Sequence, residues 1–252
     1  MELIILGHII GDFYLQTNLI ASKKKESLKF LALHCLLYCI PVITGAVIVG
    51  GSSIKKYFVF SLLLFLTHFV VDKMKNDFDK RGHYMGIIFL LDQVVHIAIL
   101  VILLRVLHIE IDNTNSLIYN YLEKKELIAM AAILVCWKPA AIFVSVIFES
   151  LFLKKKDEES EKVAEKKEET NDGQEHQENV RVGYWIGVLE REIILVLGLL
   201  GQYGAIGFVL TAKSLARYKQ LEQQEFAEKY LVGTLMSAFI AFCCLFICNK
   251  YK

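Results

Sequence analysis

The chain has 252 residues, of which 55% are hydrophobic and only 2 are proline, and its mean hydropathy is +0.46. Charged residues make up 22% of the chain and are concentrated in residues 154–181, so the remainder is too apolar for the surface of a soluble domain. The composition therefore argues against a soluble enzyme and a disulfide-stabilised secreted domain. A net charge of +1 gives no reason to expect a nucleic-acid partner. A multi-pass membrane protein is indicated.

A helix that crosses a membrane needs about 20 mostly apolar residues. We expect spans at 2–21, 30–50, 57–75, 86–107 and 127–153, then an apolar region at 184–212 and a last span at 230–248. The apolar region fits either an interfacial helix with one span or a hairpin that turns near Gly201–Gly204. The hairpin is favoured because it brings the charges of Glu190–Glu192 near Lys213 and Arg217. The predicted fold is an all-α polytopic transmembrane helical bundle of about seven to eight spans.

Lysine and arginine residues in short loops give the expected orientation. The loops that follow the first and third spans are rich in lysine, which places them in the cytosol and the N-terminus outside. The domain prediction is a five-span module at 1–153, a charged, disordered cytosolic linker at 154–182, and a C-terminal membrane module at 183–252.

Several predicted spans carry ionisable residues, and three of them pair a His with an Asp four positions away. These pairs are His8–Asp12, His68–Asp72 and Asp92–His96. Residues four apart lie on one face of a helix. His34, on the second span, lies at a similar depth to His68. An ionisable side chain inside a bilayer costs at least a few kcal/mol and is by default a sign of function. We expect these groups to meet in one cavity in the cytosolic half of the membrane.

Three kinds of chemistry fit this set. Mixed His and carboxylate ligands suit a divalent metal, either Zn²⁺, or Mn²⁺ and Fe²⁺ where carboxylates are more numerous. Such an ion with an open position activates water for hydrolysis. The same Asp–His pairs could instead form a proton or ion pathway. Alternatively, each His bonds its own Asp, and the polar groups only hold the bundle together.

Further residues are candidates for supporting roles. Gln16 and Gln93 are placed near the same cavity, where either could orient a substrate or a ligand. Lys213 and Arg217 lie four apart on one helix face at the expected interface, which suits a phosphate head group. Ordinary snorkelling of basic side chains at the end of a span is the simpler interpretation of this pair.

Three motifs carry a family resemblance: HIIGDFYLQTNLIASKKKESLKFLALH, LTHFVVDKMK and FLLDQVVHI. Together they resemble a bacterial multi-pass membrane family known as domain of unknown function 3307. The segment IGVLEREIILVLGLLGQYGAIGFVLTAKSLAR also looks like the C-terminal part of that family. The resemblance implies a bacterial inner-membrane protein and no established activity.

The sequence thus predicts an intramembrane metallohydrolase that acts on a lipid or lipid-linked substrate from the cytosolic side. The predicted metal ligands are His8, Asp12, His68, Asp72, Asp92 and His96, and the predicted catalytic residues are Asp12, His34, Gln16 and Gln93. The expected partners are membrane lipids, and a cytosolic protein could bind the linker. A proton- or metal-ion-coupled transporter or channel is the first alternative, and a structural or regulatory membrane component is the second.

Overall fold

The computed structural model describes most of the chain. For residues 77–79 and 172–181 it describes the backbone and not the side chains. The described residues are 1–79, 85–111, 119, 121–152 and 172–251. Within these ranges the chain forms helices and no strand, apart from an isolated bridge between Gly50 and Ile111. The predicted all-α class is confirmed. The chain divides into two compact units, 1–134 and 135–252, which are described separately.

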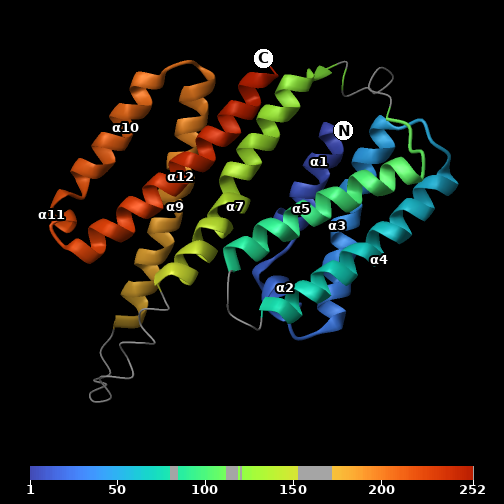
Figure 1. The fold of residues 1–252 in the computed structure, drawn as a ribbon, viewed down its shortest axis with the longest axis horizontal. Helices are drawn as coiled ribbons and strands as arrows, with labels where there is room; N and C mark the ends of the chain where they lie inside the picture. Colours follow the sequence, from blue (N-terminus) through green and yellow to red (C-terminus); the bar gives the residue numbers. More distant parts are fainter. Residues whose placement is uncertain (80–84, 112–118, 120, 153–171, 252) are drawn as a thin grey trace. The chain divides into compact units, whose positions relative to one another are not determined.

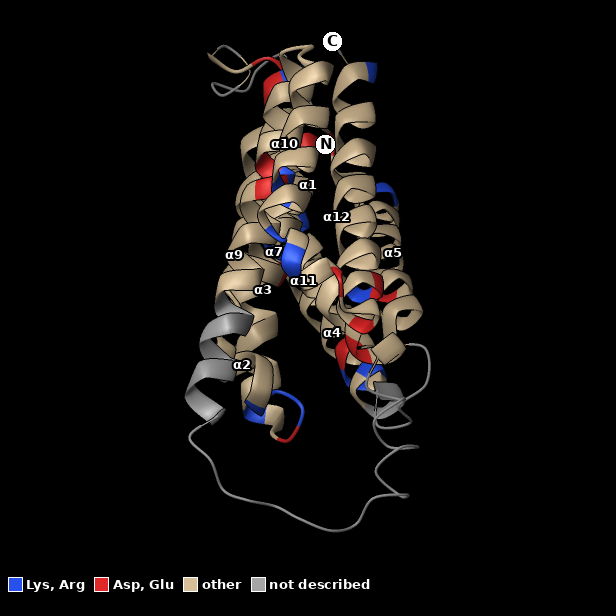
Figure 2. Ribbon diagram, turned by 90° about the vertical axis from the view of Figure 1, so that its left-hand side faces the viewer, with Lys and Arg blue, Asp and Glu red and all other residues tan. Residues whose placement is uncertain are grey.

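Five of the described helices are long and apolar enough to cross a membrane. They are α3 (Leu28–Val49), α4 (Ile54–Asp79), α5 (Met85–Val106), α7 (Lys124–Phe152) and α12 (Gln224–Lys250). Long stretches of these helices carry no charged residue (Figure 2). All five overlap predicted spans, but the expected total of seven to eight spans is not confirmed.

The first predicted span is interrupted. Helix α1 (Glu2–Ile9) continues into one π-helical segment, Ile10–Tyr14, and α2 (Asn18–Lys23) begins anew after Thr17. In the π segment, the Leu15 amide donates to the Ile10 carbonyl, five residues back. The segment 2–21 is therefore not the continuous helix that the sequence predicted. Single π turns inside helices are often found at functional sites, and this one contains Asp12.

The first unit is a bundle in which α1 packs on α3, α3 on α4, and α4 on α5 (Figure 1). Glycines permit the closest of these contacts. A Cβ added at Gly7 would lie 2.5 Å from the Pro41 carbonyl oxygen, and one at Gly11 would lie 2.9 Å from the Tyr38 carbonyl oxygen. The Gly7–Gly11 spacing is the small-xxx-small pattern that lets membrane helices approach closely. It presses His8 and Asp12 against α3.

The second unit contains the rest of α7 together with α9 (Asp172–Leu199), α10 (Tyr203–Ala216), α11 (Tyr218–Leu221) and α12. α9 packs on both α10 and α12. Between α9 and α10 the chain reverses at Gly201, whose φ of 73° is favourable for glycine. The predicted hairpin is confirmed.

Two features explain why neither α9 nor α10 is among the five helices that are long and apolar enough to cross a membrane. The centre of α9 carries three consecutive charged residues, Glu190–Glu192. α10 has only 14 residues, which is about 21 Å of helix against a hydrocarbon core of about 30 Å.

The boundaries of the units differ from the predicted domains. The first unit ends at Leu134, within α7, whereas the predicted module extended to residue 153. Most of the predicted linker, residues 154–171, lies outside the described residues. Helix α9 begins at Asp172, before the predicted end of the linker at residue 182.

Candidate metal centre

The structure brings together the seven His and Asp side chains that the sequence singled out. They are His8 and Asp12 from α1 and the π segment, His34 from α3, His68 and Asp72 from α4, and Asp92 and His96 from α5. Each is at most 9% exposed. Four segments that are distant in sequence therefore converge on one buried polar cluster inside the first unit.

His34 lies at the centre of the cluster. Its Nε2 atom is 3.3 Å from Nε2 of His68, 3.3 Å from Oδ1 of Asp12 and 3.3 Å from Oδ2 of Asp72. Nε2 of His68 is 4.0 Å from Oδ1 of Asp12. A ring nitrogen carries at most one hydrogen, so His34 cannot satisfy all three neighbours by donating hydrogen bonds.

Two sets of three residues have potential ligand atoms within 4.8 Å of one another. The first set is Asp12, His34 and His68, and the second is His68, Asp72 and His96. Both sets contain His68. A neutral imidazole has one lone pair to offer, so His68 could serve as a ligand in only one of the two sets at a time.

The ring orientations agree with ligation through Nε2. Nδ1 of His96 lies 2.8 Å from the backbone oxygen of Asp92, which leaves Nε2 directed toward Asp72, 3.6 Å from its Oδ1. An Nδ1–H bond to a backbone carbonyl is the usual way in which a metal-binding His is oriented. His68 is held by stacking on Tyr38, with ring centroids 3.8 Å apart.

Gln93 connects the ligands with their surroundings. Its Nε2 donates to Oδ2 of Asp12 at 2.9 Å and to Oδ2 of Asp92 at 3.1 Å. Its Oε1 lies 3.2 Å from Nε2 of His8, whose Nδ1 bonds the Tyr38 hydroxyl at 3.1 Å. His8 is therefore engaged on both nitrogens and belongs to neither set of converging ligand atoms. Gln93 holds Asp12 so that its Oδ1 faces His34.

Two lysines close one side of the cluster. Nζ of Lys24 is 2.8 Å from Oδ2 of Asp72, and Nζ of Lys75 is 2.7 Å from Oδ2 of Asp92. The Asn76 side chain holds Lys24 in place by donating a hydrogen bond to its backbone carbonyl. Three carboxylates thus face two lysines, and the remaining negative charge favours a cation among the imidazoles.

The opposite side of the cluster is apolar. On every helix the core residues continue away from the lysines, as with Ile4 on α1, Val42 on α3, Leu64 on α4 and Leu100 on α5. All four are at most 2% exposed. The described part of the first unit therefore presents lysines on one side of the cluster and a packed hydrocarbon core on the other.

The remaining predicted residues belong to neither set of potential ligand atoms. Gln16 is partly buried just after the π segment. Lys213 lies on α10 and Arg217 directly follows this helix, both in the second unit. Sequence reasoning missed Tyr38, which lies one turn from His34 on the same face, and used Lys24 and Lys75 only as loop markers. No local sequence signal marks these three as part of the cluster, since an aromatic residue or a lysine at those positions is common in membrane helices.

The comparisons with known proteins address the first unit. Residues 1–123 match the model of the family described as Protein of unknown function (DUF3307). No curated protein matches the chain, and no solved structure does either. The match ends before the second unit begins, so it does not extend to the C-terminal segment that also carried the resemblance. The family resemblance is thus confirmed over residues 1–123, the part of the chain that holds the whole His/Asp cluster and is similar to DUF3307.

Proposed function

We propose that the protein is an integral membrane metallohydrolase that acts on a lipid or lipid-linked substrate from the cytosolic side of a bacterial inner membrane. The observation that carries this proposal is the convergence of Asp12 Oδ1, His34 Nε2 and His68 Nε2 at 3.3–4.0 Å from one another in a buried site. Ligands about 2.0–2.1 Å from a tetrahedral zinc ion lie about 3.3 Å apart. The three atoms are spaced as ligands of a common ion would be.

The crowding around Nε2 of His34 supports the same proposal. This nitrogen lies 3.3 Å from two carboxylate oxygens and 3.3 Å from the Nε2 atom of His68, and it carries at most one hydrogen. Buried acceptors without a donor cost free energy, and a cation bound among them would compensate for that cost. Zn²⁺ suits this mixed set, and Mn²⁺ or Fe²⁺ would be favoured if Asp72 joined it.

The other members of the cluster have roles in the proposed reaction. Asp12, His34 and His68 would hold the ion, which would supply an activated water by lowering the pKa of the water that it binds. Asp72 and His96 lie in the same cluster as a carboxylate–imidazole pair, 3.6 Å apart. Asp72 is the proposed general base and His96 the proposed proton donor to the leaving group. Gln93 positions Asp12.

The two sides of the cluster favour a hydrolase over a transporter. A transporter needs a polar path that continues through the membrane, but Val42, Phe60, Leu64 and Leu100 fill the side away from the lysines. The lysine side is where a substrate would enter. Lys24 is 12% and Lys75 24% exposed at the side chain, so both can reach a negatively charged substrate group.

The proposal can be tested with full-length protein in liposomes. The protein is stripped with chelator and reloaded with Zn²⁺, Mn²⁺ or Fe²⁺, and release of product is followed from a panel of lipid phosphate esters and acyl esters. We expect metal-dependent hydrolysis that Asp72→Asn lowers by about 10²–10⁴-fold and that the control His108→Ala, an exposed histidine on a loop, leaves unchanged. Hydrolysis that persists without metal, or that Asp72→Asn does not lower, would contradict the proposal.

A further inference from the structure

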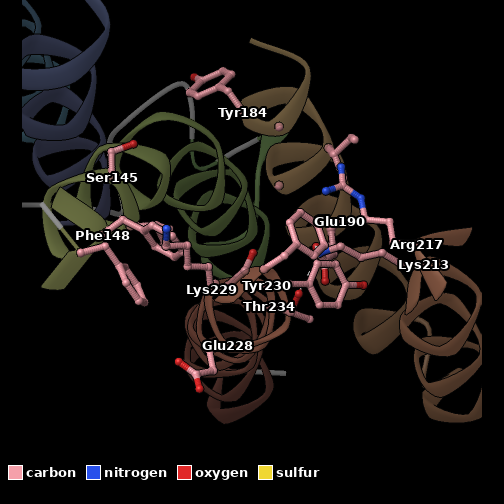
Figure 3. A pocket seen from close by; sticks show the side chains of 18 of the residues that line it. Ser145, Phe148, Tyr184, Glu190, Lys213, Arg217, Glu228, Lys229, Tyr230 and Thr234 are labelled. Carbon is pink, nitrogen blue, oxygen red and sulfur yellow. Dashed lines mark hydrogen bonds and ion pairs between the residues drawn. The ribbon is translucent and has the colours of Figure 1, made fainter. Parts of the chain in front are cut away.

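The second unit has a pocket of its own. It has a volume of about 1170 Å³ and is lined by parts of α7, α9, α10 and α12 (Figure 3). Figure 3 shows Glu190, Lys213, Arg217, Tyr230 and Thr234 gathered on one side. Four acidic and four basic side chains line the pocket. Because the opposite charges are equal in number, the lining suits a ligand that carries both signs better than a simple anion or cation.

Glu190 offers an unsatisfied acceptor to this ligand. The residue is 4% exposed, and its Oε2 is paired with Nζ of Lys213. Lys213 also donates to Thr234 Oγ1 at 3.1 Å. Oε1 of Glu190 is buried without a hydrogen-bond partner among the described residues. A buried carboxylate oxygen in this condition calls for an N–H donor.

Arg217 offers the complementary charge. Its guanidinium lies over Tyr230, 6.0 Å from the ring centroid, and over Phe226 at 5.9 Å. No carboxylate of the described residues lies within ion-pair distance of it. Lys213 lies over the same Tyr230 ring, at 5.2 Å, so Arg217 and Glu190 border one small region. A guanidinium presents a fork of donors that matches a phosphate.

The pocket lies where a lipid head group would. α7 ends at Phe152, α10 ends at Ala216 and α12 begins at Gln224, and the pocket is lined from all three of these helix ends. Aromatic residues such as Tyr184 and Tyr230 are typical of the membrane–water interface. Phe148 and Phe152, with ring centroids 4.8 Å apart, extend the wall as an apolar surface suited to an acyl chain.

We infer that this pocket binds one zwitterionic phospholipid of the phosphatidylethanolamine class. Arg217 holds the phosphate, the primary ammonium donates to Oε1 of Glu190, and an acyl chain lies against Phe148 and Phe152. This site is separate from the His/Asp cluster and does not depend on the proposed hydrolysis. It assigns Lys213 the role of orienting Glu190 rather than of contacting the phosphate.

The inference is tested by binding to delipidated, full-length protein in detergent, measured by native mass spectrometry. The probes are phosphatidylethanolamine, phosphatidylglycerol and phosphatidylcholine with identical chains, together with free phosphoethanolamine. Phosphatidylcholine keeps the positive charge but has no N–H to donate to Glu190. We expect phosphatidylethanolamine to bind about tenfold tighter than either of the other lipids. Free phosphoethanolamine should bind much more weakly, and equal binding would identify a soluble head-group ligand and overturn the lipid assignment.

Two variants locate the site. Glu190→Gln should abolish the preference for phosphatidylethanolamine, and Arg217→Gln should weaken the binding of all three lipids. The matched controls Glu222→Gln and Lys219→Gln change exposed residues and should bind like the wild type. Equal binding of the three lipids to the wild type, which needs no variant, would overturn the inference. A preference that survives Glu190→Gln would overturn it as well.

Discussion

The two units both bury charged side chains among apolar helices, but they satisfy them in different ways. In the second unit, the donors of Arg191 are matched with acceptors: Nε bonds the Cys136 carbonyl at 2.7 Å, Nη1 bonds Ser237 Oγ at 3.1 Å, and Nη2 faces the Trp137 carbonyl at 3.5 Å. In the first unit, three neighbours surround Nε2 of His34, which carries at most one hydrogen.

This difference separates a structural charge from a candidate site. Arg191 ties α7, α9 and α12 together, and each of its three side-chain nitrogens has an acceptor without a ligand. The His/Asp cluster has a surplus of acceptors that only an additional cation or proton can compensate. Burial of an ionisable residue is thus weak evidence for function by itself, and the balance of donors and acceptors around it is stronger evidence.

Replacement of Arg191 should have the largest effect on stability. Arg191→Ala removes a large, fully buried side chain and its charge-assisted hydrogen bonds, so we expect a loss of about 2–5 kcal/mol. Thermal unfolding in detergent measures it, with Lys219→Ala as an exposed control. Metal content per folded chain should stay at the wild-type level, because the cluster lies in the other unit. A loss of metal from folded Arg191→Ala would show that the two regions do not act separately.

A methyl group between α1 and α3 should have a smaller effect on stability but a direct effect on the cluster. Gly11→Ala places a Cβ 2.9 Å from the Tyr38 carbonyl, and such overpacking costs about 1–3 kcal/mol. Because Asp12 follows Gly11 directly, metal affinity should fall as well, as measured by competition with a chelator. Gly204→Ala is the control, since its Cβ would have no neighbour within 4 Å. Unchanged affinity in Gly11→Ala would argue against Asp12 as a ligand.

Neutralising the Asp12 carboxylate should have the smallest effect on stability, and it should stabilise the metal-free protein rather than destabilise it. Asp12→Asn removes one of the charges crowded around His34, so the metal-free protein should become more stable by about 0.5–1 kcal/mol, a gain typical of relieving an active-site compromise. The measurement is the unfolding temperature in the presence of chelator. The same variant should bind metal more weakly than the wild type. A destabilised metal-free Asp12→Asn would indicate that the cluster is structural.

Much of this arrangement was predictable from the sequence. Apolar length located the five long helices, and the four-residue spacing of His68–Asp72 and Asp92–His96 placed each pair on one helix face. The expectation that these pairs meet in one cavity agrees with the 3.6 Å approach of His96 to Asp72. The sequence also predicted the hairpin at Gly201, because a hairpin allows the charges of 190–192 to pair with Lys213. The structure contains the ion pair between Glu190 and Lys213.

Other features depend on contacts that no local pattern encodes. The π segment at Asp12 adds one residue to a helical turn. The apolar sequence around it is equally compatible with a regular α-helix, so the sequence does not predict the π segment. Asp72 is 2% exposed and is shared by Lys24, His34 and His96, which no spacing within one helix predicts. Its surroundings come from Lys24, His34 and His96, which lie on other segments of the chain, so its burial is a tertiary feature.

The most direct test of the central claim is the metal content of the purified, full-length protein. Elemental analysis of wild type, His34→Ala and the exposed-histidine control His108→Ala is combined with X-ray absorption at the metal edge. The account predicts about one Zn, Mn or Fe per chain with nitrogen and oxygen ligands at about 2.0–2.2 Å, lost in His34→Ala and kept in His108→Ala. A wild type that holds no metal after chelator-free purification and metal add-back would contradict it, and so would metal retained in His34→Ala.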